Sequence, residues 1–364
     1  MKKTKKPRAS SLSLVRNGSV PVYEQIAKHL LDKISSGQMP VGTKLPGTKI
    51  LAKELGVNHL TLRQALQKLE QLGAVSMESG RGTFVIPRES ETISVALILP
   101  NLNESSSRIS AGVQEVLAPF SAQVSIFHFD ENPELEREQL ARLQNEKFDG
   151  AIVFPSLDPI SLKPLLNLLI AGYPLVFIDR APTELPCWSV LSDNFRGGFL
   201  AANRLLDAGC QRLACLATEI GTVHDRLEGF KRALNDRGHV VDHSLIHTEH
   251  SEKFSVETIV DQWLARPAPP DGIFFPNDFR ASLGVRRLTQ LGRRVPAEIK
   301  VVGFDNLSIA QLSLPSLTTV AQNFAQIGRT AAELLREMVS LEPEKRFVAR
   351  REIVPVELIA RESA

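Results

Sequence analysis

The 364-residue sequence contains little cysteine, few aromatic residues and no long hydrophobic run. Its three cysteines, Cys187, Cys210 and Cys215, are odd in number and irregularly spaced, so they predict reduced core thiols rather than a disulfide framework. No apolar run approaches the roughly 20 residues that a membrane-spanning helix needs. The first ten residues also lack the apolar core of a signal peptide. These absences predict a cytoplasmic chain that does not associate with a membrane.

The sequence also lacks a nucleophile–base–acid arrangement, so we expect no catalytic residue and no cofactor. His239, His243 and His247 recur every four residues, as metal ligands on one helical face would. Gly238 ends the preceding helix, however, and the residues after it predict a loop and then a strand. We therefore expect no metal site. The Gly80–Gly82 segment lacks the Lys-Ser/Thr ending of a phosphate-binding loop, which argues against a nucleotide hydrolase.

The charge of the chain is divided unevenly along its length. Residues 1–88 contain fifteen Lys or Arg against five Asp or Glu, a net charge of +10. The whole chain carries +2, which leaves −8 for residues 89–364. A basic head on an acidic body is typical of a nucleic-acid-binding module joined to a second domain.

The residues from 45 to 85 predict a short helix, a turn, a longer helix and a Gly-tipped hairpin. Gly56 separates the two helices, and Asn58 suits the N-cap of the second. His59, Arg63 and Gln67 share the solvent-facing stripe of that second helix. Apolar residues recur on its other face with helical spacing and predict a core, namely Leu62, Ala65, Leu66, Leu69 and Leu72.

Two short strands flank the hairpin tip, where Arg81 stands between two glycines. Helix, turn, helix and basic wing together predict a reader of duplex DNA whose second helix enters the major groove. A small helical cap with a surface hairpin is the alternative, but the basic charge independently favours DNA.

The head resembles the GntR-type winged-helix domain over about residues 20–87. The resemblance rests on Ile26, Leu30 and Ile34 of the first helix, the Gly42…Leu45-Pro46 turn, Leu51-Ala52, Thr61, Arg63-x-Ala65-Leu66 and Gly80-x-Gly82-Thr83-Phe84. It implies that DNA is met by Lys49, His59, Thr61, Arg63 and the wing residues Gly80, Arg81 and Gly82. We add Leu60, near the solvent face of the same helix, as a candidate contact.

Three departures from the family pattern affect this interpretation. Gly47 stands where Ser is usual, Lys49 where Arg is usual, and Asn58-His59 where Ser-Arg is usual. Lysine lacks the bidentate guanidinium, so Lys49 is expected to clamp a phosphate rather than to read a base. For Leu60 two interpretations stay open, because this side chain would either rest on a thymine methyl or pack under the wing.

From Ile93 onward, β-branched apolar runs alternate with amphipathic helical stretches. Continuous apolar strands separated by helices predict parallel sheets that are covered on both faces. We predict an α/β fold in which an N-terminal winged helix-turn-helix domain precedes a two-lobed, periplasmic-binding-protein-like domain with parallel sheets. The runs are ISVALILP, DGAIVFP, PLVFID, RLACLAT, DGIFFPND and IKVVGFD.

Polar residues follow four of these runs, at Pro155-Ser156, Asp179-Arg180, Asn277-Asp278 and Asp305-Asn306. Open α/β sheets bind small ligands at the carboxyl ends of their strands. Carboxylates and amides there suit a hydroxyl-rich ligand. The alternative for Asp278 is that it merely caps the next helix.

The body resembles the effector domain of LacI/GalR-type repressors over about residues 94–359. The resemblance rests on PLVFIDR, Ser192-Asp193-Asn194, Arg226-Leu227-x-Gly229-Phe230, Phe254-Ser255-Val256-Glu257, Pro276-Asn277-Asp278, VPAEIKVVGFDN and LTTVAQN. It implies effector contacts by Ser105, Ser106, Asp179, Thr222, Arg226, Phe254, Asn277, Asp305 and Gln322. Purine-binding relatives often carry aromatic residues at the positions of Ser105 and Ser106, so a sugar is favoured. The combined layout resembles arabinose-repressor-type regulators, which implies a pentose or a related sugar.

The resulting prediction is a sugar-responsive transcriptional regulator, a repressor, that binds a palindromic DNA operator as a homodimer. The alternatives are a sugar-processing enzyme and a transport-type sugar receptor, each with an accessory DNA-binding head. The predicted domains are a basic arm (1–18), the winged head (19–87), a linker (88–93) and the body (94–360). Within the body we predict one lobe from 94–191 plus 322–340 and another from 192–317 plus 345–360.

Overall fold

The computed structural model describes residues 21–35, 38–78, 80–86, 93–146, 148–182, 185–218, 221–249 and 255–364. The chain divides into two compact units, a head and a body, between Thr92 and Ile93. The predicted arm and all but the last residue of the predicted linker lie outside the described residues. Within the described part of the chain, no helix combines the length and the apolar character needed to cross a membrane.

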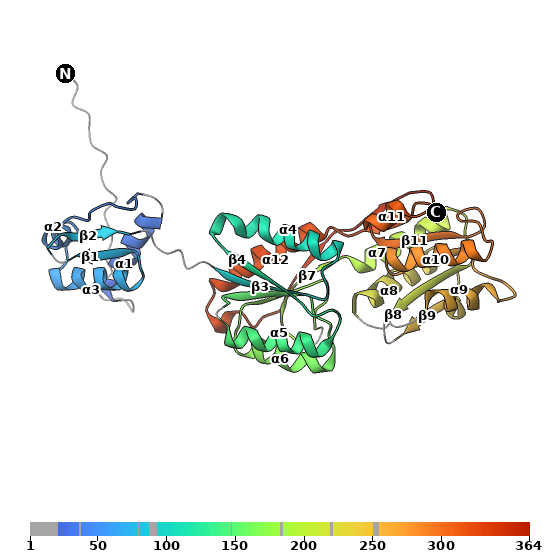
Figure 1. Cartoon of the computed structure of the whole chain (residues 1–364), viewed down its shortest axis with the longest axis horizontal. Coiled ribbons are helices and arrows are strands. Elements are labelled where there is room, and N and C mark those ends of the chain that lie inside the picture. The colour runs from blue at the N-terminus through green and yellow to red at the C-terminus, as the bar shows by residue number, and fades with distance from the viewer. Residues whose placement is uncertain are drawn as a thin grey trace, which may run out of the picture. The chain divides into compact units, whose positions relative to one another are not determined.

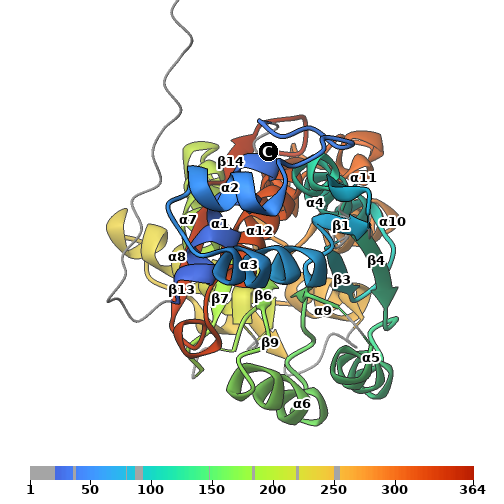
Figure 2. The ribbon, with the colours of Figure 1, turned by 90° about the vertical axis from the view of Figure 1, so that its left-hand side faces the viewer.

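The head is a three-helix unit with a two-stranded wing, and Figure 2 shows its helices toward the viewer. Helices α1 (Val22–Ser35), α2 (Thr48–Glu54) and α3 (His59–Gln71) surround one apolar core. Strands β1 (Val75–Glu78) and β2 (Gly82–Val85) pair antiparallel and form the wing. The predicted helix-turn-helix and hairpin are therefore present in the predicted order.

Local chemistry explains where α3 begins and which face it buries. The Asn58 side chain accepts a hydrogen bond from the backbone N–H of Leu60 at 3.0 Å, so Asn58 is the N-cap. Leu72 is half-buried at the C-cap. The other four residues of the predicted apolar stripe are fully buried, namely Leu62, Ala65, Leu66 and Leu69.

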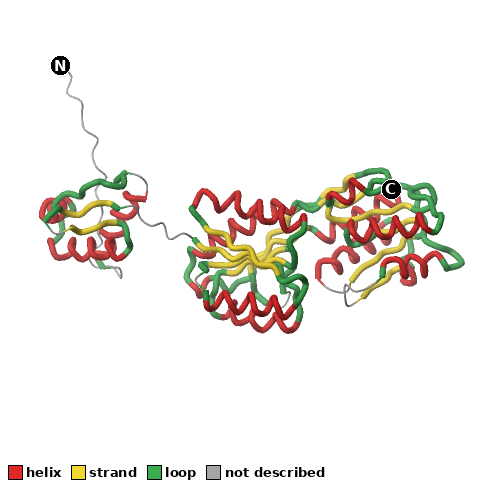
Figure 3. The backbone as a smooth tube through the Cα atoms, viewed as in Figure 1, coloured by secondary structure: helices red, strands yellow, loops and turns green. Residues whose placement is uncertain are grey.

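The body contains two six-stranded sheets, each between two layers of helices (Figures 1 and 3). The first sheet has the order β13-β7-β6-β5-β3-β4, and its strand pairs are all parallel. Helices α4 (Glu104–Leu117) and α12 (Phe324–Val339) cover one face, and α5 (Pro133–Asn145) and α6 (Pro159–Ile170) cover the other. The strands are β3 (Ser94–Leu99), β4 (Gln123–His128), β5 (Gly150–Val153), β6 (Leu175–Ile178), β7 (Trp188–Ser192) and β13 (Arg350–Val354).

The second sheet has the order β14-β12-β11-β10-β8-β9, and only its edge strand β14 runs antiparallel. Helices α7 (Asn194–Asp207) and α8 (Gly221–Asp236) pack on one face. Helices α9 (Val256–Leu264) and α10 (Asp278–Gln290) pack on the other, and the short α11 (Ser308–Leu312) lies against α10. The strands are β8 (Leu213–Thr218), β9 (Ile246–Glu249), β10 (Gly272–Phe274), β11 (Lys300–Asp305), β12 (Thr318–Ala321) and β14 (Glu357–Ile359). Short 3₁₀ turns complete the body at η1 (Ala118–Phe120), η2 (His243–Leu245) and η3 (Pro343–Lys345).

The predicted fold class is confirmed, but one predicted lobe boundary is wrong. We expected residues 345–360 to complete the second lobe, whereas β13 pairs with β7 in the first sheet. Arg346 also belongs to the first lobe, because its guanidinium donates to the Gly172 carbonyl at 2.8 Å. Of the residues after α12, only those that follow β13 return to the second sheet, where β14 pairs with β12.

In each lobe, a glycine allows two helices to cross at a short distance. A Cβ on Gly198 of α7 would lie 1.8 Å from the Arg226 carbonyl oxygen of α8. A Cβ on Gly112 of α4 would lie 2.1 Å from the Ala325 carbonyl oxygen of α12. Side chains larger than hydrogen at these positions would force the helices apart.

The three cysteines are buried and free, as the sequence predicts. Burial raises the pKa of Cys187 and of Cys210 to about 11, and it raises the pKa of Cys215 further. A thiol with so high a pKa is protonated at neutral pH and therefore a poor nucleophile.

Candidate functional site

The first turns of α3 present side chains to solvent. His59, Leu60 and Arg63 are exposed, and Thr61 is half-buried. Leu60 is 57% exposed, so the interpretation in which it packs under the wing is wrong. The contact with a thymine methyl remains as the prediction for this side chain.

Arg63 lies one turn after His59 on the same exposed face of α3. Among the described residues it makes no hydrogen bond or ion pair, so all five of its N–H donors are available to a partner. Lys49 is likewise exposed, on α2. Side chains that read base edges need donors without a protein partner, because the base then has to displace only water.

The wing brings a second group of cations to the surface of the head. Gly80 and Gly82 have φ angles of +75° and +119°, which glycine adopts without strain, and Arg81 between them is 77% exposed. Arg81 pairs with Glu78 at 2.5 Å, an exposed contact of small free energy that a phosphate can replace. Sequence reasoning missed Lys44, which lies beside the wing with its ammonium 5.6 Å from the Phe84 ring centroid.

In the body, polar side chains from both sheets gather around Arg226. Asp179 follows β6 of the first sheet with a φ angle of +61°, and Asp305 ends β11 of the second sheet with a φ angle of +106°. Both carboxylates act electrostatically on Arg226 of α8. We call Asp179, Arg226, Asp305 and Gln322 the cleft cluster, because they meet at the carboxyl ends of the two sheets.

Protein groups hold the Arg226 guanidinium firmly in place. Nε donates to Oδ1 of Asn194 at 2.8 Å, and one terminal nitrogen donates to the Pro276 carbonyl at 2.5 Å. The guanidinium also stacks 3.7 Å from the ring centroid of Phe304. Only 5% of the residue is exposed, so the cation is positioned before any ligand arrives.

Gln322 connects the two lobes within this cluster. Its amide nitrogen donates to Oδ1 of Asp305 at 2.7 Å, and its amide oxygen accepts from the Ser192 hydroxyl at 2.5 Å. Ser192 ends β7 of the first sheet, whereas Asp305 ends β11 of the second. A rotation of one lobe against the other would therefore change the hydrogen bonds around the cleft cluster.

A second bridge between the lobes starts from the first turn of α4. Glu104 accepts from the backbone N–H of Ser308 at 2.8 Å, and Arg108 donates to the Asn306 carbonyl at 3.2 Å. The predicted contacts Ser105 and Ser106 belong to the same turn, beside the segment that follows Asp305. The Ser105 hydroxyl donates to Asn103, so it is engaged in capping α4.

The structure rules out the alternative in which Asp278 caps α10. Asn277 is the N-cap, since its side-chain oxygen accepts from the Arg280 N–H at 2.9 Å. Asp278 is fully buried and accepts from the Thr319 hydroxyl at 2.6 Å and the Leu307 N–H at 2.8 Å. Asp278 therefore fixes the loop after Asp305, a role that its place in the sequence did not indicate.

The remaining predicted residues are distributed as follows. Thr222 is buried one helical turn before Arg226 on α8, which places it near the cleft cluster. Phe254 lies outside the described residues. Ser156, after β5, is held by the buried Glu136, which accepts from its backbone N–H at 2.9 Å and from its hydroxyl. Sequence reasoning missed Ser192 and Asn194 as members of the site, although Ser192 ends β7 and Asn194 begins α7 two residues later.

Burial raises the pKa of two carboxyl groups in the second lobe, Asp305 at the end of β11 and Asp278 at the start of α10. It raises the pKa of Asp305 to about 7, and the nearby charges of Asp278 and Asp179 raise it while Arg226 and the Gln322 hydrogen bond lower it. Burial also raises the pKa of Asp278 to about 6 against the hydrogen bonds that it accepts. A ligand hydroxyl that donates to Asp305 would stabilise its ionised form. Among the described residues, no group of three or more His, Cys, Asp or Glu side chains is arranged to hold a metal ion.

Two family models match separate parts of the chain. Residues 22–85 match the model for bacterial regulatory proteins of the gntR family, and residues 202–364 match the periplasmic binding protein-like domain. These matches correspond to the head and to the second part of the body.

Several relatives are similar over most of their length. The arabinose metabolism transcriptional repressor of Geobacillus stearothermophilus is 28% identical over 89% of this chain and 93% of its own. The HTH-type transcriptional repressor PurR of Photobacterium profundum is 31% identical over 69% of this chain and 76% of its own. Both names describe repressors, one of arabinose metabolism.

Solved structures share the fold. A LacI family transcriptional regulator from Enterococcus faecium with bound ribose is 28% identical, with a TM-score of 0.62 over 74% of this chain and 98% of its own. The complex of transcriptional regulator CelR with cellobiose has a TM-score of 0.66 at 24% identity, over 88% of this chain and 100% of its own. Ligand-bound members of this fold therefore include two whose ligand is a sugar.

Proposed function

We propose that this chain is a repressor controlled by a sugar. It belongs to the transcriptional regulators that join a GntR-type DNA-binding head to a LacI-type, periplasmic-binding-protein-like body. The observation that carries the proposal is the cleft cluster. It presents two carboxylates, an amide and a fixed guanidinium at the carboxyl ends of both sheets. Sugar hydroxyls need such acceptors and donors, and a ligand that bridges both lobes stabilises one lobe arrangement.

In this proposal the residues have distinct roles. Asp305 and Asp179 accept hydrogen bonds from sugar hydroxyls, one from each lobe. Arg226 donates to a ring or hydroxyl oxygen of the sugar. Gln322 changes its hydrogen bonds to Asp305 and Ser192 as the lobes close. The walls of the proposed sugar site are completed by Thr222, Asn277, Ser105 and Ser106. We propose the same role for Phe254.

The head reads DNA through α3. Arg63 and His59 contact base edges, Leu60 contacts a thymine methyl, and Thr61 supports them. Lys49 and the wing bind phosphates and so fix the register of the head on the duplex. Because two-fold symmetric proteins bind two-fold symmetric sites, we propose a homodimer on a palindromic operator. Sugar binding releases the operator.

We further propose that the chain acts in the cytoplasm and catalyses no reaction. Three buried, unpaired thiols support a reducing compartment. The Arg226 guanidinium, which Asn194, the Pro276 carbonyl and Phe304 hold in place, suits ligand binding.

A thermal-shift screen followed by calorimetry tests the effector class. The full chain is titrated with neutral pentoses and hexoses and, in parallel, with purine bases and nucleosides. A ligand of the folded state raises the melting temperature by mass action. Binding of a sugar supports the proposal, whereas binding of purines alone would replace the sugar by a base as the effector.

Operator control is tested separately. DNA selected from a random pool by the full chain gives an operator, and fluorescence anisotropy then measures its affinity with and without the sugar. A selected site without two-fold symmetry contradicts the dimer. An affinity that the sugar leaves unchanged contradicts the control of DNA binding.

A further inference from the structure

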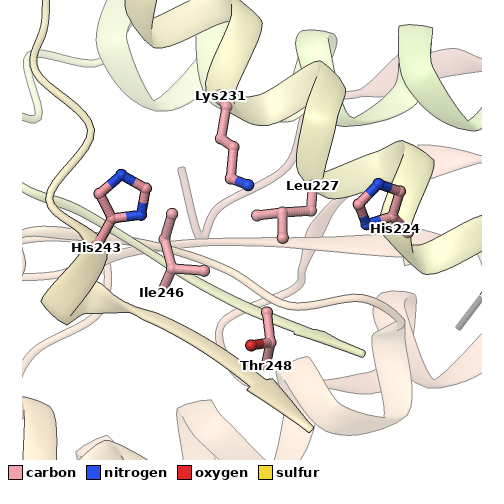
Figure 4. A pocket seen from close by; sticks show the side chains of 6 residues that line it. All are labelled: His224, Leu227, Lys231, His243, Ile246 and Thr248. Atoms are coloured by element: carbon pink, nitrogen blue, oxygen red, sulfur yellow. The ribbon is translucent and has the colours of Figure 1, made fainter. Parts of the chain in front are cut away.

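A cavity of about 390 Å³ lies between α8 and β9, at the outer edge of the second sheet. Figure 4 shows the side chains that line it, with the Lys231 ammonium between the imidazole rings of His243 and His224. We call it the α8–β9 cavity. Its volume falls within the range of roughly 300–1,000 Å³ that is usual for small-molecule sites. Its lining residues are His224, Leu227, Lys231, His243, Ile246 and Thr248.

Helix and strand periodicity explain why these side chains meet. His224, Leu227 and Lys231 are spaced by three and four residues, so they form one stripe of α8. Ile246 and Thr248 are two residues apart on β9, so they point to the same face of the sheet. His243 comes from η2, directly before β9. Arg226 belongs to a different stripe of α8, so the cavity is separate from the cleft cluster.

The charge of the α8–β9 cavity is opposite to that of the body. The body carries a net −8, yet the lining residues that the structure describes include no carboxylate. Lys231 pairs with Glu228, the residue one helical turn earlier, at 2.8 Å. That carboxylate is 42% exposed, so solvent weakens its hold on the ammonium. A neighbouring cavity shares Lys231 and His243 but is lined by Glu228 itself, which makes it unsuitable for an anion.

The lining chemistry specifies the kind of ligand. One ammonium, two imidazoles and a hydroxyl are donors for an anion with several terminal oxygens, as a phosphoryl group is. Leu227 and Ile246 supply an apolar surface for a short carbon chain. Among the described lining residues the imidazoles are the only aromatic rings, so these residues offer little surface on which a nucleobase could stack.

We propose that the α8–β9 cavity binds a small phosphomonoester. Lys231 neutralises the phosphoryl charge, His224 and His243 donate hydrogen bonds to its oxygens, and Leu227 and Ile246 contact the organic part. This site is distinct from the cleft cluster and does not depend on the proposed function, because it is tested without DNA or sugar.

The test measures binding of glycerol 3-phosphate to the full chain by calorimetry and ³¹P line broadening, in a phosphate-free buffer. Glycerol and inorganic phosphate are the comparison ligands. We expect glycerol 3-phosphate to bind, inorganic phosphate to bind more weakly and glycerol not to bind. Lys231→Met keeps the aliphatic stem and should weaken glycerol 3-phosphate binding about tenfold or more, because it removes the one permanent cation among the described lining residues.

Two further variants complete the design. His243→Gln should also weaken binding, which keeps the test decisive if Lys231→Met proves unstable in thermal unfolding. Arg237→Gln is the matched control, since this cation follows α8, pairs with Asp207 and lines neither cavity. Binding by Arg237→Gln should stay within about twofold of wild type. Absence of binding at millimolar glycerol 3-phosphate, or equal affinities of wild type, Lys231→Met and His243→Gln, would overturn the proposal.

Discussion

Sugar binding is expected to strengthen with pH because Asp305 must lose its proton to accept two hydroxyl hydrogens. Burial raises the pKa of this carboxyl to about 7 in the free protein. About one tenth of the molecules are then ionised at pH 6 and about nine tenths at pH 8. If only the ionised form binds well, the dissociation constant should fall roughly tenfold between these two pH values.

Calorimetry measures both consequences of this linkage. Titrations at pH 6, 7 and 8 give the dissociation constants. Titrations at pH 6 in two buffers of different ionisation enthalpy give the number of protons released, which we expect to approach one. Asp305→Asn keeps the shape of the side chain but cannot ionise, so its affinity should be lower and nearly independent of pH.

The same shift predicts an opposite effect on the stability of the free protein. In the unfolded chain an aspartate titrates near pH 4, whereas folded Asp305 titrates near 7 and folded Asp278 near 6. The folded state therefore binds protons more tightly, and its free energy of unfolding falls as pH rises from about 4 to about 7. Asp305→Asn should lessen this fall, as a series of melting temperatures measured across this pH range would show.

For sugar binding, a dissociation constant that stays the same from pH 6 to 8, without proton release, would refute the assignment of Asp305 as an ionised acceptor.

Three other perturbations test the remaining parts of the molecule. Arg63→Ala should cost on the order of 1–3 kcal/mol of operator affinity and relax base preference. Lys49→Ala should instead weaken binding to all DNA sequences similarly and reduce the salt dependence of binding. Anisotropy titrations at several salt concentrations separate the two effects. After insertion of a flexible Gly-Ser segment following Arg88, operator binding should persist in saturating sugar, because the predicted six-residue linker would no longer transmit lobe movement to the head. Full release of the operator by sugar from this variant would point to dimer dissociation instead. Gly198→Ala should destabilise the body by about 1–3 kcal/mol or more, since its Cβ would lie 1.8 Å from a carbonyl oxygen; a denaturation midpoint equal to that of wild type would contradict the close helix crossing.

The sequence alone determined those features that depend on neighbours along the chain. The apolar spacing of α3, its cap at Asn58 and the glycines of the wing predicted the helix-turn-helix and its exposed face. The continuous apolar runs predicted parallel strands covered on both faces, and polar residues at their ends predicted where a ligand site would form. Each of these patterns has a period or a local hydrogen bond that one segment carries by itself.

Tertiary structure decided which of these segments meet. The stacking of Arg226 on Phe304 and its bond to Asn194 join three elements that lie far apart in sequence. The return of β13 to the first sheet depends on which edge strand offers free hydrogen-bonding groups, and residues 345–360 do not reveal that. The α8–β9 cavity likewise exists only because η2 and β9 pack beside α8. Periodicity reports that a residue is buried, but the partners that bury it, and the charges that shift its pKa, are set by contacts across the whole chain.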